Sequence, residues 1–220
     1  MSSTILSTKK LSLAQKELLL NAKINFVAYD AVKIDFKDFT LPAKADNYIF
    51  TSQNAVLSFL KKGGVLNAVF CVGLKTKALL ETNGFKVLEI ANNAMALAKI
   101  IVEKYKNESF IHLTGNLRRP ELPTHLKKNN VRYNEVEVYH TIMQEKQFNQ
   151  SFDGVLFFSP SGVQSYSIKN KLNNATAFCI GETTANEAKK LTQNIIVANT
   201  PSIENVLVQA IKYNLSLIHI

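Results

Sequence analysis

Three observations predict an α/β protein built from two similar lobes, each a parallel β-sheet flanked by helices. The chain has 220 residues, 46% of them hydrophobic, so it can bury a sizeable core. Short apolar runs alternate with patterns of helical period, as in parallel sheets with crossover helices. The second half of the chain repeats the first at an offset near 107 residues. Two lobes with a cleft between them are therefore expected.

The predicted strands and helices follow each other in the same order in both halves: strand, helix, strand, strand, helix, strand, helix, strand, helix. The segments 11–21 and 120–129 carry Leu and Lys at helical spacing, and Asn21 and Asn129 at their ends can serve as C-caps. Nearly continuous apolar runs are typical of buried parallel strands. Such runs predict strands at 47–50, 68–72, 109–113, 154–158 and 176–180.

The internal repeat extends over several matched segments. Residues 49–56 match 156–163 at an offset of 107, residues 70–73 match 178–181 at 108, and residues 90–92 match 197–199 at 107. A nearly constant offset over separate segments indicates an ancestral duplication. It leaves open whether each half folds on itself or the lobes exchange halves. The tail 215–220 has no counterpart in the first half.

Composition restricts the class of protein. No apolar stretch approaches the roughly 20 residues of a membrane span, and charged residues interrupt any signal-peptide pattern, so a cytoplasmic protein is expected. Cys71 and Cys179 stand in separate apolar runs, which indicates buried thiols in a reducing compartment. The net charge of +9 favours polyanionic partners, and both nucleic acid and acidic small molecules remain candidates.

Hydroxyl-bearing and glycine-rich turns follow the predicted strands at their carboxyl ends, where open α/β sheets bind ligands. Backbone N–H groups at a helix start bind anions, and Gly permits a close approach. A Ser or Thr that only caps its own helix is the alternative for any single turn. The turns are Thr51-Ser52-Gln53-Asn54, Gly73-Leu74-Lys75-Thr76, Gly115-Asn116-Leu117-Arg118-Arg119, Ser159-Pro160-Ser161-Gly162 and Gly181-Glu182-Thr183-Thr184.

The familiar catalytic signatures are absent from the sequence. It has no P-loop, dinucleotide-binding, zinc-protease or serine-hydrolase motif, and its four His residues have no metal-ligand spacing. No metal and no cofactor are therefore expected. Tyr139 lies in an extended stretch of the second half, whereas Val32 takes its place in the first half. This phenol is a candidate proton donor, with a half-buried strand tyrosine as the alternative of equal weight.

Taken together, the motifs resemble the uroporphyrinogen-III synthase family over nearly the whole chain. The pieces Phe158-Ser159-Pro160-Ser161-Gly162 and Ile180-Gly181-x-Thr183-Thr184-Ala185 are the most specific, and Lys9 stands where many relatives have Arg. The other matching segments are 50–56, 115–123 and 138–141.

The resemblance implies lobes that exchange halves. Residues 1–34 would join 143–220 in one domain, and 35–142 would form the other. Strands near 32–36 and 138–142 would then connect the two domains as a hinge.

The reaction implied by the resemblance is closure of the linear tetrapyrrole hydroxymethylbilane to uroporphyrinogen III, with loss of water and inversion of ring D. This is a cofactor-independent hydro-lyase reaction of haem biosynthesis. Tyr139 would act as the general acid. A monomer is expected, with the tetrapyrrole as its partner and neither nucleic acid nor membrane. The resemblance implies substrate binding by Lys9, Thr51, Ser52, Asn54, Gly73, Thr76, Gly115, Asn116, Arg119, Ser159, Ser161, Gly162, Gly181, Thr183 and Thr184.

Two other classes of protein share part of this pattern. A two-lobed, non-enzymatic binding protein for a polycarboxylate would also have duplicated α/β lobes. A basic nucleic-acid-binding module is favoured by the net charge alone. Turnover of the ligand separates the first alternative from an enzyme, and a steep fall of DNA affinity with salt would support the second.

Overall fold

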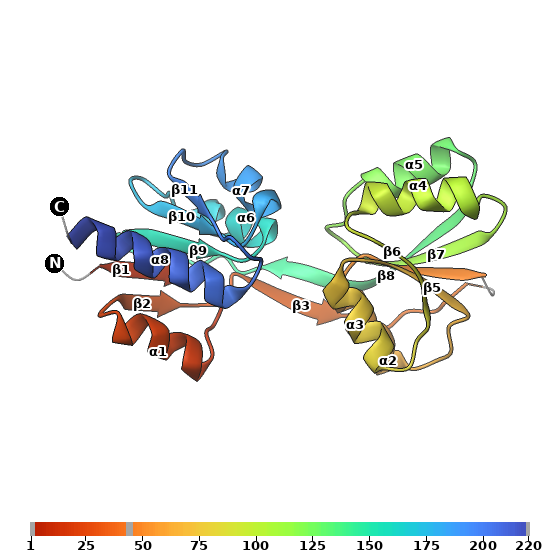
Figure 1. Ribbon diagram of the computed structural model, residues 1–220, viewed down its shortest axis with the longest axis horizontal. Coiled ribbons are helices and arrows are strands. Elements are labelled where there is room, and N and C mark those ends of the chain that lie inside the picture. Colours follow the sequence, from red (N-terminus) through yellow and green to blue (C-terminus); the bar gives the residue numbers. More distant parts are fainter. Residues whose placement is uncertain (1–2, 43–45, 219–220) are drawn as a thin grey trace. The chain divides into compact units, whose positions relative to one another are not determined.

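A computed structural model describes residues 3–42 and 46–218, and within these ranges the predicted α/β class is confirmed (Figure 1). The chain separates into two compact units. Unit 1 consists of Met1–Lys33 and Ile142–Ile220, and unit 2 of Ile34–Thr141. Each unit contains its own sheet.

Unit 1 has a five-stranded sheet in the order β11-β10-β9-β1-β2, with parallel pairing between neighbours. Helices α1 and α8 pack on one face of this sheet and α6 and α7 on the other (Figure 1). The strands are β1 (Thr4–Ser7), β2 (Asn25–Ala28), β9 (Gly154–Phe157), β10 (Thr176–Cys179) and β11 (Ile195–Val197). The helices are α1 (Leu13–Asn21), α6 (Pro160–Lys169), α7 (Glu182–Ala188) and α8 (Ile203–Ile218).

Unit 2 has a six-stranded sheet in the order β3-β8-β7-β4-β5-β6. Helices α2 and α3 cover one face and α4 and α5 the other. The strands are β3 (Val32–Phe36), β4 (Asn47–Phe50), β5 (Ala68–Val72), β6 (Val87–Ala91), β7 (Ser109–Gly115) and β8 (Arg132–Met143). The helices are α2 (Gln53–Lys62), α3 (Leu74–Thr82), α4 (Ala94–Lys104) and α5 (Glu121–Lys128).

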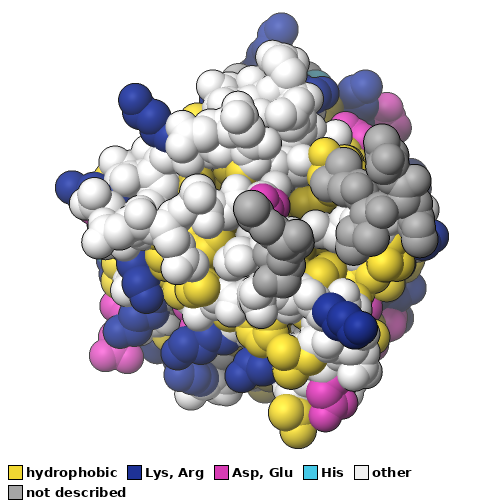
Figure 2. All heavy atoms as spheres, turned by 90° about the vertical axis from the view of Figure 1, so that its left-hand side faces the viewer, with side chains coloured by type: hydrophobic (Ala, Val, Ile, Leu, Met, Phe, Trp, Pro, Cys, Tyr) yellow, Lys and Arg dark blue, Asp and Glu magenta, His cyan; other side chains and the backbone are white. Residues whose placement is uncertain are grey.

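The basic side chains are dispersed on the face that Figure 2 shows. Lys and Arg appear there at several separate places, with hydrophobic and uncharged polar side chains between them. The high net charge of the chain is not gathered into one continuous patch on this face.

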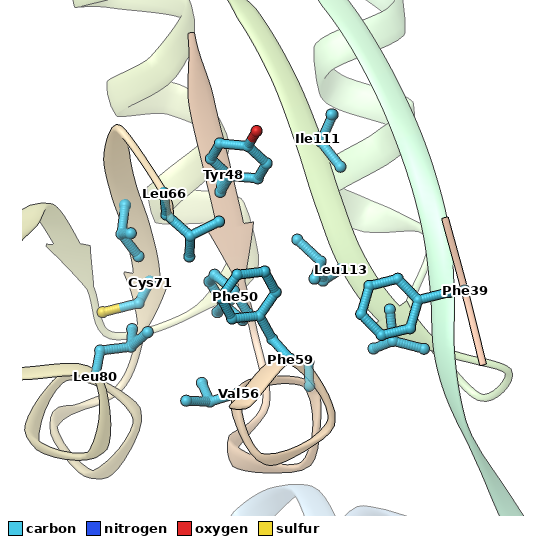
Figure 3. Packing of buried hydrophobic residues seen from close by; sticks show 13 residues of the cluster. Phe39, Tyr48, Phe50, Val56, Phe59, Leu66, Cys71, Leu80, Ile111 and Leu113 are labelled. Atoms are coloured by element: carbon cyan, nitrogen blue, oxygen red, sulfur yellow. The ribbon is translucent and has the colours of Figure 1, made fainter. Parts of the chain in front are cut away.

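The buried strands are apolar on both sides because helices cover both faces of each sheet. In unit 2, Phe50 of β4 packs edge-to-face on Phe59 of α2, with ring centroids 6.1 Å apart, and Leu113 of β7 lies beside them (Figure 3). Ile49, the neighbour of Phe50, points to the opposite face and joins the cluster under α4 and α5. This packing holds the ends of the central strands in place.

Each sheet combines strands from both halves of the chain. The sheet of unit 1 joins β1 and β2 to β9, β10 and β11, whereas that of unit 2 joins β4, β5 and β6 to β7 and β8. The chain passes from one unit to the other within β3 and again within β8. At the repeat offset, β8 corresponds to β2 and β3 together, so a single long strand replaces two short ones.

The predicted element bounds hold for β4 and β5 and shift by one or two residues elsewhere. Strand β7 continues to Gly115, while β9 and β10 end at Phe157 and Cys179. Helix α1 starts after Ser12, whose side-chain oxygen accepts a hydrogen bond from the backbone N–H of Gln15 at 3.3 Å.

The expected C-caps are right in one helix and wrong in the other. Asn129 caps α5 as predicted, but Asn21 is the last residue of α1 and Ala22 is its cap. In both repeats the chain leaves the helix through a left-handed residue, Lys23 (φ 56°) and Asn130 (φ 57°). Of the tail without a repeat counterpart, residues 215–218 belong to α8, and 219–220 lie outside the described residues.

Candidate functional site

The carboxyl ends of the central strands lie at one level in each sheet. In unit 2, Phe50 at the end of β4 is level with Cys71 of β5 and Leu113 of β7. In unit 1, Leu156 of β9 is level with Ser7 of β1. The turns that follow these strands therefore line one side of each sheet, which we call the carboxyl edge of the unit.

Ser52 and Ser159 begin the helices that follow β4 and β9. The Ser52 side-chain oxygen accepts a hydrogen bond from the backbone N–H of Asn54 at 3.1 Å, and Ser159 accepts one from Gly162 at 3.0 Å. Capping uses a lone pair and leaves each hydroxyl hydrogen available for donation. Ser161 lies 3.0 Å from Ser159, so these two hydroxyls can share one of their hydrogens.

Gly73 and Gly181 begin the next helix in each unit, and no side chain caps either helix. Gly73 has φ 85°, which favours glycine, whereas Gly181 has an extended φ of −179° that any residue adopts. A β-carbon at either position would meet nothing within 4 Å. Thr76 and Thr184 are buried in the first turns of these helices, while Thr183 is exposed.

Tyr139 lies against Gly115 where β8 passes the end of β7. A register shift between Thr114 and Gly115 brings Gly115 opposite Tyr139. A β-carbon at Gly115 would lie 2.5 Å from both Cε2 and Cζ of the Tyr139 ring, which is closer than atoms can approach. The ring is half-buried against the core under α2. Among the described residues, nothing is hydrogen-bonded to its hydroxyl.

Asn116 binds the backbone of β8 next to Tyr139. Its side-chain oxygen accepts a hydrogen bond from the Thr141 N–H at 2.9 Å, and its side-chain nitrogen donates to the Thr141 carbonyl at 3.3 Å. This amide holds the strand that carries the phenol. Arg119 and Lys9 are exposed beside the carboxyl edges of their units.

A chain of hydrogen bonds runs through unit 2 from the carboxyl edge to an ion pair. The Thr51 hydroxyl oxygen lies 3.0 Å from His112 Nε2, and His112 Nδ1 lies 2.7 Å from the Tyr133 hydroxyl oxygen. The Tyr133 hydroxyl donates to Glu135 Oε1 at 2.8 Å. Glu135 accepts from Arg118 through both carboxylate oxygens, at 2.6 Å from Nε and 2.7 Å from Nη2.

Burial controls the ionisation of this chain. It lowers the pKa of His112 from 6.5 to about 4, although the nearby Glu135 carboxylate acts in the opposite direction. His112 is therefore neutral at pH 7. Burial also raises the pKa of Tyr133, and its hydrogen bond to Glu135 raises it further.

Apart from Thr51, the members of this chain are not among the predicted site residues. His112 stands between the buried apolar residues Ile111 and Leu113, and Ile5 takes its place in the other repeat. A buried imidazole where the matching position is aliphatic is the signal that could have identified it. Its partners follow only from the register of β7 and β8, in which His112 is level with Glu135.

Other kinds of site receive no support from the part of the chain that the structure describes. Within residues 3–42 and 46–218, no three His, Cys, Asp or Glu side chains are grouped as metal ligands. No helix in these ranges has the length and hydrophobicity needed to cross a bilayer. Cys71 and Cys179 are free, and burial raises the pKa of their thiols to about 11 and about 12.

Comparison with known proteins identifies similar sequences and folds. The sequence profile described as Uroporphyrinogen-III synthase HemD matches residues 21–207. A search of curated proteins gave no significant match. The crystal structure of uroporphyrinogen-III synthetase from Helicobacter pylori 26695 is 20% identical and has a TM-score of 0.72 over 97% of this chain and 100% of that chain.

A second solved structure has the same fold. A mutant uroporphyrinogen III synthase from the extremely thermophilic bacterium Thermus thermophilus is 12% identical, with a TM-score of 0.73 over 98% of this chain and 99% of that chain. At these identities the two structures support the fold, while the profile match supports the family.

Proposed function

The chain belongs to the uroporphyrinogen-III synthase family, and from this premise we propose how the residues at its carboxyl edges serve the reaction. The enzyme cyclises hydroxymethylbilane to uroporphyrinogen III with loss of water and inversion of ring D, a step of tetrapyrrole biosynthesis. What remains to be assigned is the proton donor and the groups that bind substrate.

Tyr139 is the general acid of this proposal. The leaving hydroxyl of hydroxymethylbilane departs as water when it receives a proton, and a phenol can supply one. The Tyr139 ring packs against the core under α2 and fills the space that a side chain at 115 would need, and in the described part of the chain its hydroxyl has no hydrogen-bond partner. A positioned, half-buried phenol at the carboxyl edge is the observation that supports this role.

The turns of both units bind the substrate carboxylates in this proposal. Each pyrrole of hydroxymethylbilane carries an acetate and a propionate, and helix starts with backbone N–H groups favour such anions by about 0.3 to 1 kcal/mol each. Ser52 and Ser159 add hydroxyl donors, and Lys9 and Arg119 add positive charge. Asn116 acts through the position of β8. The other residues proposed to bind the substrate, through its carboxylates or its pyrrole groups, are Thr51, Asn54, Gly73, Thr76, Gly115, Ser161, Gly162, Gly181, Thr183 and Thr184.

We also propose two domains, 1–34 with 143–220 and 35–142, in a cytoplasmic monomer with no nucleic-acid or membrane partner. The chain separates into two compact units, with sequence boundaries between residues 33 and 34 and between 141 and 142. This separation supports the proposed domain boundaries. Two free, buried thiols suit a reducing compartment. The dispersed Lys and Arg side chains on the face in Figure 2 argue against a nucleic-acid surface there.

Separation of isomers tests the activity. Hydroxymethylbilane generated enzymatically closes by itself to the uninverted isomer I, so the purified protein should convert it mainly to isomer III. The activity should persist after dialysis against a chelator. A product mixture identical to that without protein would refute the activity.

A further inference from the structure

We infer that His112 is a positioning residue that fixes the direction of the Thr51 hydroxyl, so that Thr51 offers a hydrogen-bond acceptor to a pyrrole N–H of the substrate. The pyrrole as occupant rests on the proposed function. The direction of the hydroxyl rests on the hydrogen-bond chain alone.

The direction follows from the acceptor at the far end of the chain. Both oxygens of Glu135 contact the Arg118 guanidinium, at 2.6 and 2.7 Å, so this carboxylate is ionised and can only accept. The Tyr133 hydroxyl therefore donates its one hydrogen to Glu135, at 2.8 Å. The Tyr133 oxygen can then only accept a hydrogen bond from His112 Nδ1, which lies 2.7 Å away. His112 must carry its hydrogen on Nδ1.

The second ring nitrogen, His112 Nε2, then determines whether the Thr51 hydroxyl donates or accepts a hydrogen bond. His112 is 2% exposed, and burial keeps it neutral, so Nε2 has a lone pair and no hydrogen. The Thr51 hydroxyl, 3.0 Å from Nε2, must donate to it. No hydrogen remains on the Thr51 oxygen for a ligand, so this partly buried hydroxyl can offer only its lone pairs.

The hydroxyl of the next residue, Ser52, can donate to a ligand, in contrast to that of Thr51. Ser52 accepts from the Asn54 N–H and keeps its hydrogen. Adjacent residues at the end of β4 therefore present an acceptor and a donor. A carboxylate meets repulsion at Thr51 and a donor at Ser52, whereas a pyrrole N–H is complementary to Thr51.

Unit 1 has the same fold without this hydrogen-bond chain. At the repeat offset, the positions of Thr51, His112, Tyr133, Glu135 and Arg118 are occupied by apolar residues that belong to one hydrophobic cluster: Phe158, Ile5, Phe26, Ala28 and Leu11. Buried polar side chains lower the stability of the fold unless each of them has a hydrogen-bond partner. Unit 2 keeps a fully partnered polar chain where an apolar cluster suffices, which indicates a role in recognition rather than in folding.

The tautomer of His112 tests the direction without substrate. ¹⁵N NMR of the labelled enzyme at pH 7 reports which ring nitrogen bears hydrogen, and the spectrum of H112L identifies the His112 signals among those of the four His residues. The inference requires a neutral ring protonated at Nδ1. A ring protonated at Nε2, or at both nitrogens, would overturn it.

Kinetics tests the contact with substrate. T51V removes the acceptor and should lower kcat/KM for hydroxymethylbilane by about 2- to 12-fold, the range of one neutral hydrogen bond. T51S keeps the hydroxyl and should restore most of the loss. An unchanged kcat/KM in T51V would overturn the pyrrole contact, whatever the tautomer.

A double-mutant cycle separates positioning from folding. H112L frees the Thr51 hydroxyl from its hydrogen bond to the ring, so kcat/KM of the H112L single variant should be lower than that of the parent. The losses of H112L and T51V should not add in the double variant. A gain in kcat/KM from H112L would mean that Thr51 acts as a donor and would overturn the inference. Should H112L fail to fold, the spectra of H125Q, H140Q and H219Q identify the His112 signals by elimination, so the tautomer and T51V measurements still decide. Failure of the proposed function itself would appear separately, as absence of isomer III formation by the parent.

Discussion

The aromatic ring of Tyr139 occupies the space where Gly115 would carry a side chain. The β-carbon of any other residue at 115 would lie 2.5 Å from two ring atoms. Glycine at this strand end is thus explained by the phenol it accommodates. The close contact also restricts where the Tyr139 hydroxyl can lie, so the strand end and the proposed acid form one structural unit.

Replacement of Gly115 by alanine should displace the Tyr139 ring. We expect a loss of about 1 to 3 kcal/mol in the free energy of unfolding, as for other overpacked sites, and a fall in kcat similar to that of Y139F. Urea unfolding and isomer III formation measure the two effects.

G154A is the matched control for this substitution. A β-carbon at Gly154 would lie 2.6 Å from Cε2 of Phe178 in unit 1, so a similar destabilisation is expected there. Its kcat per folded molecule should stay at the parent value. If G115A and G154A lost kcat to the same extent, the link between Gly115 and Tyr139 would fail.

Gly181 and Gly73 should respond differently to alanine. Gly73 has φ 85°, so G73A should lose about 1 to 2 kcal/mol of stability through backbone strain. Gly181 is extended with open space beside it, so G181A should unfold like the parent. If a carboxylate approaches this turn, G181A should raise KM by about twofold to fivefold. Parent-like KM in G181A would remove the turn from the binding site.

His112 should make the protein less stable as the pH falls. Its pKa is lowered from 6.5 to about 4 by burial, so below pH 6.5 the unfolded chain binds a proton that the native ring does not. Between pH 6.5 and 4 the free energy of unfolding should drop by up to about 3 kcal/mol from this residue.

Comparison with H112L isolates the contribution of His112 to this pH dependence. Urea unfolding at pH 7 and pH 4.5 should give a shallower decline for H112L than for the parent. Equal declines would show that the ring is not buried in its neutral form.

The strands could be predicted from the sequence where burial on both faces requires apolar residues. Strands β4 and β5 match their predicted bounds because helices cover both faces, which requires continuous apolar runs. Strand β8 exceeds its predicted extent because residues 132–137 are mostly polar, with none of them buried, and so lack such a run.

The details of the candidate site were less predictable because they depend on strand register. The contact between Gly115 and Tyr139 requires a register shift after Thr114, and the pairing of His112 with Tyr133 requires β7 and β8 to align as they do. No local pattern in the sequence encodes either alignment. The anion-binding character of the turns could be inferred, whereas the direction of the Thr51 hydroxyl required the hydrogen-bond chain.

The rate of isomer III formation by Y139F is the most direct test of the central claim, that the phenol held against Gly115 protonates the leaving hydroxyl. The substitution keeps the ring and its packing, so thermal unfolding should match that of the parent. We expect kcat to fall at least severalfold and by up to roughly 10²- to 10⁴-fold, the range that general acids contribute. A Y139F enzyme with the fold and kcat of the parent would contradict the claim.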